Sequence, residues 1–144
     1  MTIILQNYKK LIIKIINDTF SSNLDSVLKS FDGFSIDNYI NLISSFDTSL
    51  CDCFTHAFIN LITELDYHYC HSLERKRKYH IKQRCSRTIL TIFGEITITR
   101  TFYKSKLNGK SFCYIDRLLG LQKYDYFDPY IKAEILDFAS DNNY

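Results

Sequence analysis

Proline and glycine are scarce in this sequence: its 144 residues include one proline and four glycines. A chain so poor in both residues has no obvious flexible or proline-rich linker. Hydrophobic residues make up 46% of it, which excludes a wholly disordered protein. The length fits one domain, or one domain with a helical extension.

Long hydrophobic runs are also missing. The longest, LIIKIIN, is interrupted by Lys14 and is far shorter than the ~20 apolar residues that a membrane span needs. The N-terminus places apolar residues before Lys9 and Lys10, an order unlike that of a signal peptide. We therefore expect no membrane partner and a cytoplasmic location.

Paired cysteine motifs are absent. The five cysteines are odd in number, irregularly spaced and without a C-x-x-C, so they predict reduced thiols rather than a disulfide framework or a zinc ribbon. Cys53 with His56, and His68 with His71, would share helix faces, but no spacing matches a known zinc finger. Bystander residues are the preferred interpretation, and we predict no metal site.

Catalytic motifs are missing as well. Acidic residues form only scattered pairs, such as Asp47 with Asp52 or Asp137 with Asp141, and a solvated helix face explains such pairs better than a Mg²⁺ site. No glycine-rich phosphate-binding motif occurs. The sequence therefore predicts no catalytic residue, no cofactor and no small-molecule substrate.

The net charge is +2, but the charged residues are unevenly distributed along the chain. Residues 75–110 hold eleven Lys/Arg and one acid, whereas the remainder holds seven Lys/Arg and fifteen acids. Such a division predicts a segment that faces a polyanion, attached to an acidic body.

Helical periodicity dominates the first half of the chain. Apolar residues at steps of three and four predict an amphipathic helix over 3–20 and a longer one over 47–73. Between them we expect one short helix, a turn at Asp32-Gly33 and a helix over 36–45 capped by Ser35.

The period changes to two after Arg84. β-Branched residues alternate in "RTILTIFGEITITRTFYK" (87–104), which predicts a β-hairpin connected at Gly94, where a positive φ is accessible. The pair Asn108-Gly109 predicts a second turn before a third strand, SFCYI (111–115). Together they predict a three-stranded antiparallel meander.

A final helix is predicted to begin at Asp128-Pro129, as N-cap and first helical residue. The fold class is therefore α+β. We divide the chain into a helical region at 1–74, a basic segment with the meander at 75–121, and a C-terminal helix at 122–144.

Basic side chains before and on the hairpin are the candidate DNA contacts, since six to ten phosphate contacts dominate non-specific DNA affinity. The alternative is a solvated helix end, because cations suit a helix C-terminus. The candidates are Arg75, Lys76, Arg77, Lys78, Lys82, Arg84, Arg87, Arg100 and Lys104. Lys106 and Lys110 would extend the same positive surface.

The hairpin and its continuation resemble the N-terminal region of the ISLre-two family of bacterial insertion-sequence transposases, which is also catalogued as an uncharacterised protein family. The family's pattern is an arginine, T-x-F-G-E, an aliphatic residue, R-x-x-Y and D-x-x-L-G-L. It falls on Arg87, Thr91, Phe93, Gly94, Glu95, Ile96, Arg100, Tyr103, Asp116, Leu119, Gly120 and Leu121. The resemblance covers roughly residues 75–144.

The resemblance implies a role in DNA transposition, with DNA at the element ends as partner. It also implies that the chemistry resides in the acidic residues of an RNase H-like domain that binds Mg²⁺. That domain would begin beyond residue 144, so this chain resembles a non-catalytic N-terminal fragment. The alternative is a module that self-associates through helices 3–20 and 47–73 without binding DNA.

Overall fold

The computed structural model describes residues 2–29, 33 and 35–141. The protein is an α+β chain, as predicted. It forms two compact units, Met1–Leu61 (unit 1) and Ile62–Tyr144 (unit 2), and their boundary lies inside a helix. Each unit is described separately below.

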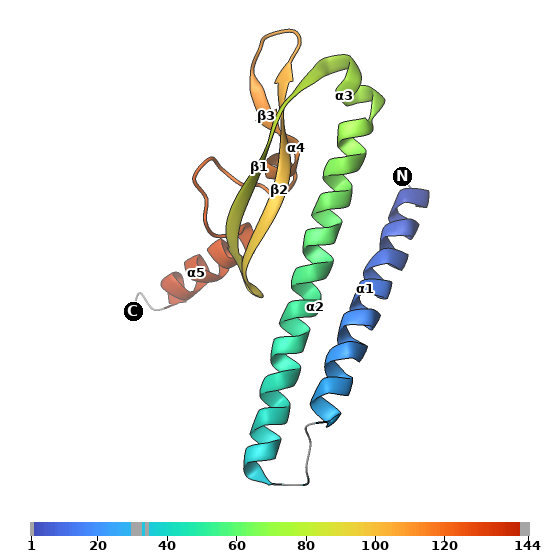
Figure 1. Ribbon diagram of the computed structural model, residues 1–144. Coiled ribbons are helices and arrows are strands. Elements are labelled where there is room, and N and C mark those ends of the chain that lie inside the picture. The colour runs from blue at the N-terminus through green and yellow to red at the C-terminus, as the bar shows by residue number, and fades with distance from the viewer. Residues whose placement is uncertain (1, 30–32, 34, 142–144) are drawn as a thin grey trace. The chain divides into compact units, whose positions relative to one another are not determined.

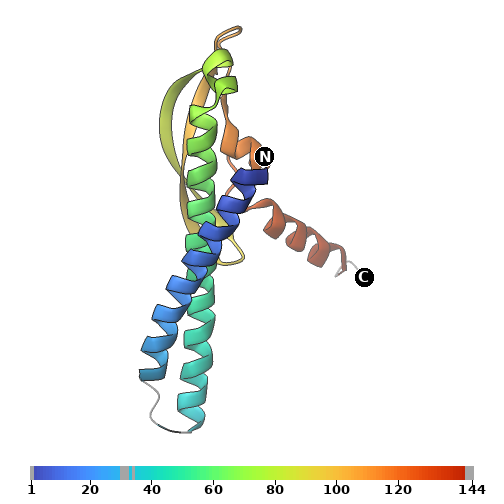
Figure 2. The same cartoon turned by 90° about the vertical axis from the view of Figure 1, so that its right-hand side faces the viewer.

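Unit 1 contains helix α1 (Thr2–Lys29) and most of helix α2 (Ile36–His71), which run antiparallel and side by side (Figures 1 and 2). The helix predicted over 3–20 continues to Lys29, and the separate short helix expected after it is not formed. The helices predicted over 36–45 and 47–73 are one helix. Ser45 and Thr48 do not interrupt it, because their hydroxyl groups donate to the carbonyls of Asn41 and Ser44 one turn earlier.

Helix α2 begins as predicted at a serine cap. Ser35 Oγ accepts a hydrogen bond from Asn38 N at 3.1 Å, and the Asn38 side chain donates to the Gly33 carbonyl. Gly33 has a φ of 85°, which glycine adopts readily. Asp32, the other residue of the predicted turn, lies outside the described residues.

Side chains from both helices meet between α1 and α2. The rings of Phe20 and Phe46 have centroids 6.3 Å apart, and Cys53 Sγ donates to the Ile16 carbonyl at 3.7 Å. The residue number on α1 falls from Phe20 to Ile16 while the number on α2 rises from Phe46 to Cys53, as antiparallel helices require.

Unit 2 is built on an antiparallel sheet in the order β1-β2-β3 (Figure 1), which confirms the predicted meander. Strands β1 (Tyr79–Thr91) and β2 (Gly94–Ser105) pair along their whole lengths, from Tyr79 with Ser105 to Thr91 with Gly94. Strand β1 therefore begins eight residues before Arg87, inside the basic segment. Gly94 has a φ of 108° at the predicted connection.

The third strand is shorter than predicted. Strand β3 (Ser111–Cys113) ends where helix α4 (Tyr114–Leu118) begins, because Ile115 turns into the core and is fully buried. Helix α5 (Pro129–Asp141) starts at the predicted cap, where Asp128 Oδ1 accepts from Ile131 N at 2.8 Å.

The core of unit 2 lies on both faces of the ribbon formed by β1 and β2. Ile89, Ile96 and Ile98 are each at most 3% exposed, and Tyr103 is fully buried. The end of α2 is attached to β2 by Asp66, whose carboxylate accepts from both the backbone N–H and the hydroxyl of Thr101. This attachment fixes the polypeptide that enters the basic segment.

Candidate nucleic-acid interface

The basic segment begins at a break between two helices. Ser72 caps the short helix α3 (Leu73–Lys78), accepting from Arg75 N at 3.1 Å. Arg75 Nε donates to the Cys70 carbonyl at 2.6 Å, which satisfies an otherwise orphaned acceptor at the end of α2. Tyr79 is extended and starts β1, so Lys76, Arg77 and Lys78 lie on the single solvent-exposed helical turn between α2 and the sheet.

The turn between β2 and β3 returns to this helical turn. Lys106 N donates to the Lys78 carbonyl at 3.0 Å, and Lys106 Nζ donates to the Lys76 carbonyl at 2.6 Å. Gly109 has a φ of 68° and closes the turn, as the Asn108-Gly109 pair predicts. Two segments about thirty residues apart are thus held side by side (Figure 1).

Lys82 belongs to the same surface. The pairing register shifts between Ile81 and Gln83, which leaves Lys82 at a bulge, and its ammonium group lies 3.4 Å from Ser111 Oγ on β3. We call the resulting surface the basic end. Its exposed cations are Lys76, Arg77, Lys78, Lys82, Lys104, Lys106 and Lys110.

Acidic groups barely neutralise the basic end. Glu74 pairs with Lys78 at 3.1 Å, but both side chains are 60% exposed, so water and salt screen the pair. Lysine and arginine side chains in such an arrangement create a positive potential that attracts polyanions and is weakened by salt.

Aromatic side chains support the basic end from below. The Phe112 ring lies 4.5 Å from that of Tyr79, and the Arg117 guanidinium lies 4.8 Å from the Phe112 centroid. Tyr69 stacks on Tyr114 at 4.0 Å. Burial, and then the charges of Glu74 and other neighbours, raises the pKa of Tyr69. The cluster joins α2, β1, β3 and α4.

Five of the nine predicted DNA contacts meet at the basic end: Lys76, Arg77, Lys78, Lys82 and Lys104. Arg84 is exposed but lies farther along β1, where it lines a small hollow with Asp66 and Tyr67. Arg75 is half-buried and caps α2, as described above. Lys106 and Lys110, which the sequence predicts as an extension of the positive surface, also lie at the basic end.

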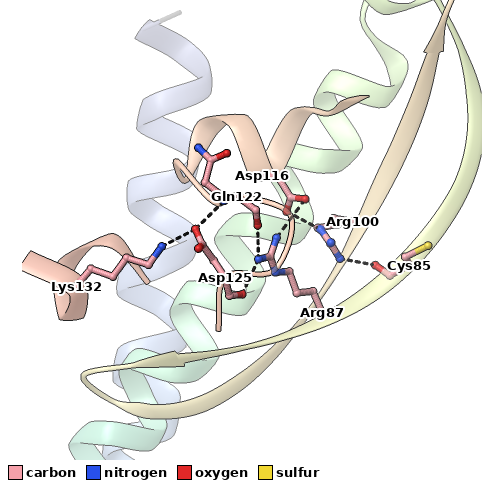
Figure 3. Close-up of polar contacts among 7 residues, drawn as sticks. All are labelled: Cys85, Arg87, Arg100, Asp116, Gln122, Asp125 and Lys132. Carbon is pink, nitrogen blue, oxygen red and sulfur yellow. Dashed lines mark hydrogen bonds and ion pairs between the residues drawn. The ribbon is translucent and has the colours of Figure 1, made fainter. Parts of the chain in front are cut away.

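Arg87 and Arg100, the other two predicted contacts, point into unit 2 and converge on Asp116 (Figure 3). Arg100 Nε donates to Asp116 Oδ1 at 2.6 Å, and its Nη1 lies 3.4 Å from the Cys85 carbonyl. Arg87 Nη1 lies 3.4 Å from Asp116 Oδ2, an electrostatic contact without hydrogen-bond geometry. The side chains of both arginines are less than 10% exposed.

Arg87 also organises the segment before α5. Its Nη2 donates to the carbonyls of Gln122 and Asp125, at 2.6 and 2.5 Å. The Asp125 carboxylate in turn accepts from Gln122 N and pairs with Lys132 on α5 at 2.6 Å (Figure 3). The hydrogen bond from Lys132 is the main cause that lowers the pKa of Asp125. This network is structural, and the sequence-based list had no partner for its arginines.

Among the described residues, no group of three or more His, Cys, Asp or Glu side chains is placed to hold a metal ion. The five thiols are free. Across the same residues, no helix is long and apolar enough to cross a membrane.

Comparison with known proteins gives a family but no solved structure. Residues 30–144 match the model of an uncharacterised protein family, UPF0236. Two relatives, UPF0236 protein TTE2489 and UPF0236 protein TTE1650/TTE2708 of Caldanaerobacter subterraneus subsp. tengcongensis, are 27% identical over 84 residues, 58% of this chain. That match spans 18% and 17% of the two relatives, and no solved structure matches. The chain therefore belongs to the UPF0236 family.

Proposed function

We propose that unit 2 binds DNA through the basic end and serves as the DNA-recognition and assembly part of an insertion-sequence transposase. The observation that carries this proposal is the convergence of seven exposed cations from α3, β1, β2 and the β2–β3 turn. The resemblance of residues 75–144 to the transposase family supplies the biological context.

The charge pattern favours phosphate binding over a merely solvated helix end. A helix dipole attracts cations to the last turn of one helix. Here, however, Lys82, Lys104 and Lys110 lie on or next to strands, where no helix dipole accounts for them. Holding like charges together costs free energy. Binding of a polyanionic partner would offset that cost, because it neutralises these charges and releases counterions.

The proposed contacts are mainly non-specific ones. Lysines are compact point charges that suit phosphate oxygens, whereas base reading needs side chains that enter a groove. In the proposal, the basic end positions the protein on the phosphate backbone. Chemistry belongs to a domain outside this chain, which is proposed to require Mg²⁺.

Fluorescence anisotropy of the full chain with a labelled DNA duplex tests this proposal. With six or more phosphate contacts, affinity is expected to fall by about 10³ or more between 50 and 200 mM salt. Arg77→Gln with Lys104→Gln removes two contacts and is expected to reduce the slope of log affinity against log salt by about 1.8.

A matched control removes the same amount of charge elsewhere. Lys29→Gln with Lys123→Gln neutralises two exposed cations outside the basic end and should leave the slope unchanged. Absence of binding at 50 mM salt, or equal effects of the two double variants, would contradict the proposal. Binding with no preference for element ends over a scrambled duplex would leave DNA binding intact and remove the recognition role.

A further inference from the structure

Unit 1 buries small side chains and exposes large ones. Within its described part, the buried side chains are Ser49, Cys53 and Ala57. By contrast, Ile36, Ile40 and other large apolar residues of α2 are exposed by 44 to 79%. Two helices touch along a single line, so a helix pair encloses very little apolar surface.

The exposed residues of α2 form a regular seam. Ile36, Ile40, Ile43, Asp47 and Leu50 follow one another at steps of four, three, four and three residues. This is the spacing by which helices in coiled coils and bundles contact a neighbour. We call these five residues the outer seam; it lies next to the face of α2 that contacts α1.

The outer seam includes a shallow, mainly apolar hollow of about 470 Å³, lined by Tyr39, Ile40, Ile43, Ser44 and Asp47. Two exposed isoleucines, 57% and 51% accessible, contribute to it. Burying one such side chain contributes about 1.5–3 kcal/mol. The outer seam is therefore apolar enough to pack against another helix.

The distribution of charge indicates which helix fits the outer seam. Residues 36–61 of α2 contain three aspartates and neither lysine nor arginine. The outer face of α1 shows the complementary pattern: Lys10, Ile13 and Lys14 are exposed, and Ile13 is 46% accessible. Within the described residues, neither these lysines nor Asp47 form an ion pair.

We propose that the outer seam binds α1 of a second copy of this chain, so that two helix pairs form a four-helix bundle. Two-fold symmetry repeats the contact, since each copy supplies one outer seam and one basic α1 face. Asp47 disfavours parallel, in-register pairing of two α2 helices, in which it would face its own copy. Against α1 it would instead face the positive charge of Lys10 or Lys14. The inference concerns unit 1 and does not depend on DNA binding.

Sedimentation equilibrium of the full chain without DNA tests the inference. A concentration-dependent dimer is expected. Ile40→Asp with Ile43→Asp should raise its dissociation constant by at least about 100-fold, because symmetry places charge in both apolar contacts. The matched control, Asn41→Asp with Thr48→Asp, adds the same charge beside the seam and should leave the dissociation constant within about threefold.

Two further measurements keep the test decisive if the isoleucine variant unfolds. The melting temperature of the unmodified protein should rise with its concentration, since association stabilises the folded state by mass action. Lys10→Glu with Lys14→Glu should weaken the dimer, and adding Asp47→Lys should restore it. A monomer at all concentrations, an unaffected isoleucine variant, or a charge reversal that is not rescued would each overturn the proposal.

Discussion

Arg100 Nε donates a hydrogen bond to Asp116 Oδ1 at 2.6 Å, and this contact joins the middle of β2 to helix α4. Asp116 also faces Arg87 on β1, so one carboxylate compensates two arginines whose side chains are each less than 10% exposed. Because a buried charge without a partner is costly, the three residues act as one structural group. All three belong to the residue pattern on which the family resemblance of the sequence rests.

Asp116→Asn should therefore destabilise unit 2 strongly. The substitution keeps the shape of the side chain but leaves two buried guanidinium groups uncompensated, for an expected loss of about 3 kcal/mol. Urea denaturation followed by circular dichroism measures the loss. Glu74→Gln, which breaks the exposed pair with Lys78, is the control and should cost less than about 1 kcal/mol. Similar losses in the two variants would contradict a structural role for Asp116.

The positions of the predicted DNA contacts show which features of the surface can be predicted from the sequence and which cannot. The alternation in β2 could be recognised because β-branched residues repeat with period two. It correctly placed Ile96 and Ile98 on one face of the strand and Thr97 and Thr99 on the other. The same alternation placed Arg100 on the buried face with the isoleucines. A sequence cannot show that a distant aspartate compensates that arginine, so Arg100 was counted with the surface cations.

Element boundaries depended on similar tertiary effects. The cap at Asp128-Pro129 was predictable because a local hydrogen bond creates it. The start of β1 at Tyr79 was not predictable, since a run of cations favours a helix end and only pairing of Tyr79 with Ser105 makes it a strand. The basic end was therefore only partly predictable. Its cations were identified from the sequence, but the contact of Lys106 with α3 depends on the conformation of the β2–β3 turn.

Tyr103→Phe should increase the stability of unit 2. Within the described residues, the Tyr103 hydroxyl is buried and has the side chains of Thr101 and Cys70 as polar neighbours, without a well-formed hydrogen bond to either, so its removal ends a desolvation penalty of about 1 kcal/mol. Tyr124→Phe changes a hydroxyl on a residue that is 86% exposed and should have no effect. Urea denaturation compares the two variants, and a destabilised Tyr103→Phe would indicate that the hydroxyl is paired.

Alkaline pH should unfold unit 2 through the same residue. Burial, and next the charge of Asp66, raises the pKa of Tyr103 above its ordinary value. Because the folded pKa lies above the unfolded value of about 10, the stabilisation is complete below pH 10 and is lost as pH rises further. The free energy of unfolding of Tyr103→Phe should fall less steeply between about pH 10 and 11 than that of the unmodified protein. Parallel curves would contradict this assignment.

Acid should loosen the start of α5. Lys132 lowers the pKa of Asp125, so this carboxylate stabilises the folded state above the ordinary value of 3.8, and the effect is lost as pH falls below it. Lys132→Gln should shift the Asp125 titration, followed by NMR of the carboxyl carbon, toward that ordinary value. Lys123→Gln, which alters an exposed cation stacked on Tyr124, is the control and should leave the titration unchanged.

Lys110 and Arg84 test where the DNA surface lies. Lys110, which extends the predicted positive surface, lies on the turn that meets α3, whereas Arg84, one of the nine candidates, lines a separate hollow. If the basic end binds DNA, Lys110→Gln should reduce the salt slope by about 0.9 and weaken binding for every DNA sequence. Arg84→Gln should leave both unchanged in the same anisotropy titration. The opposite ranking would move the DNA surface from the end of the sheet to the middle of β1.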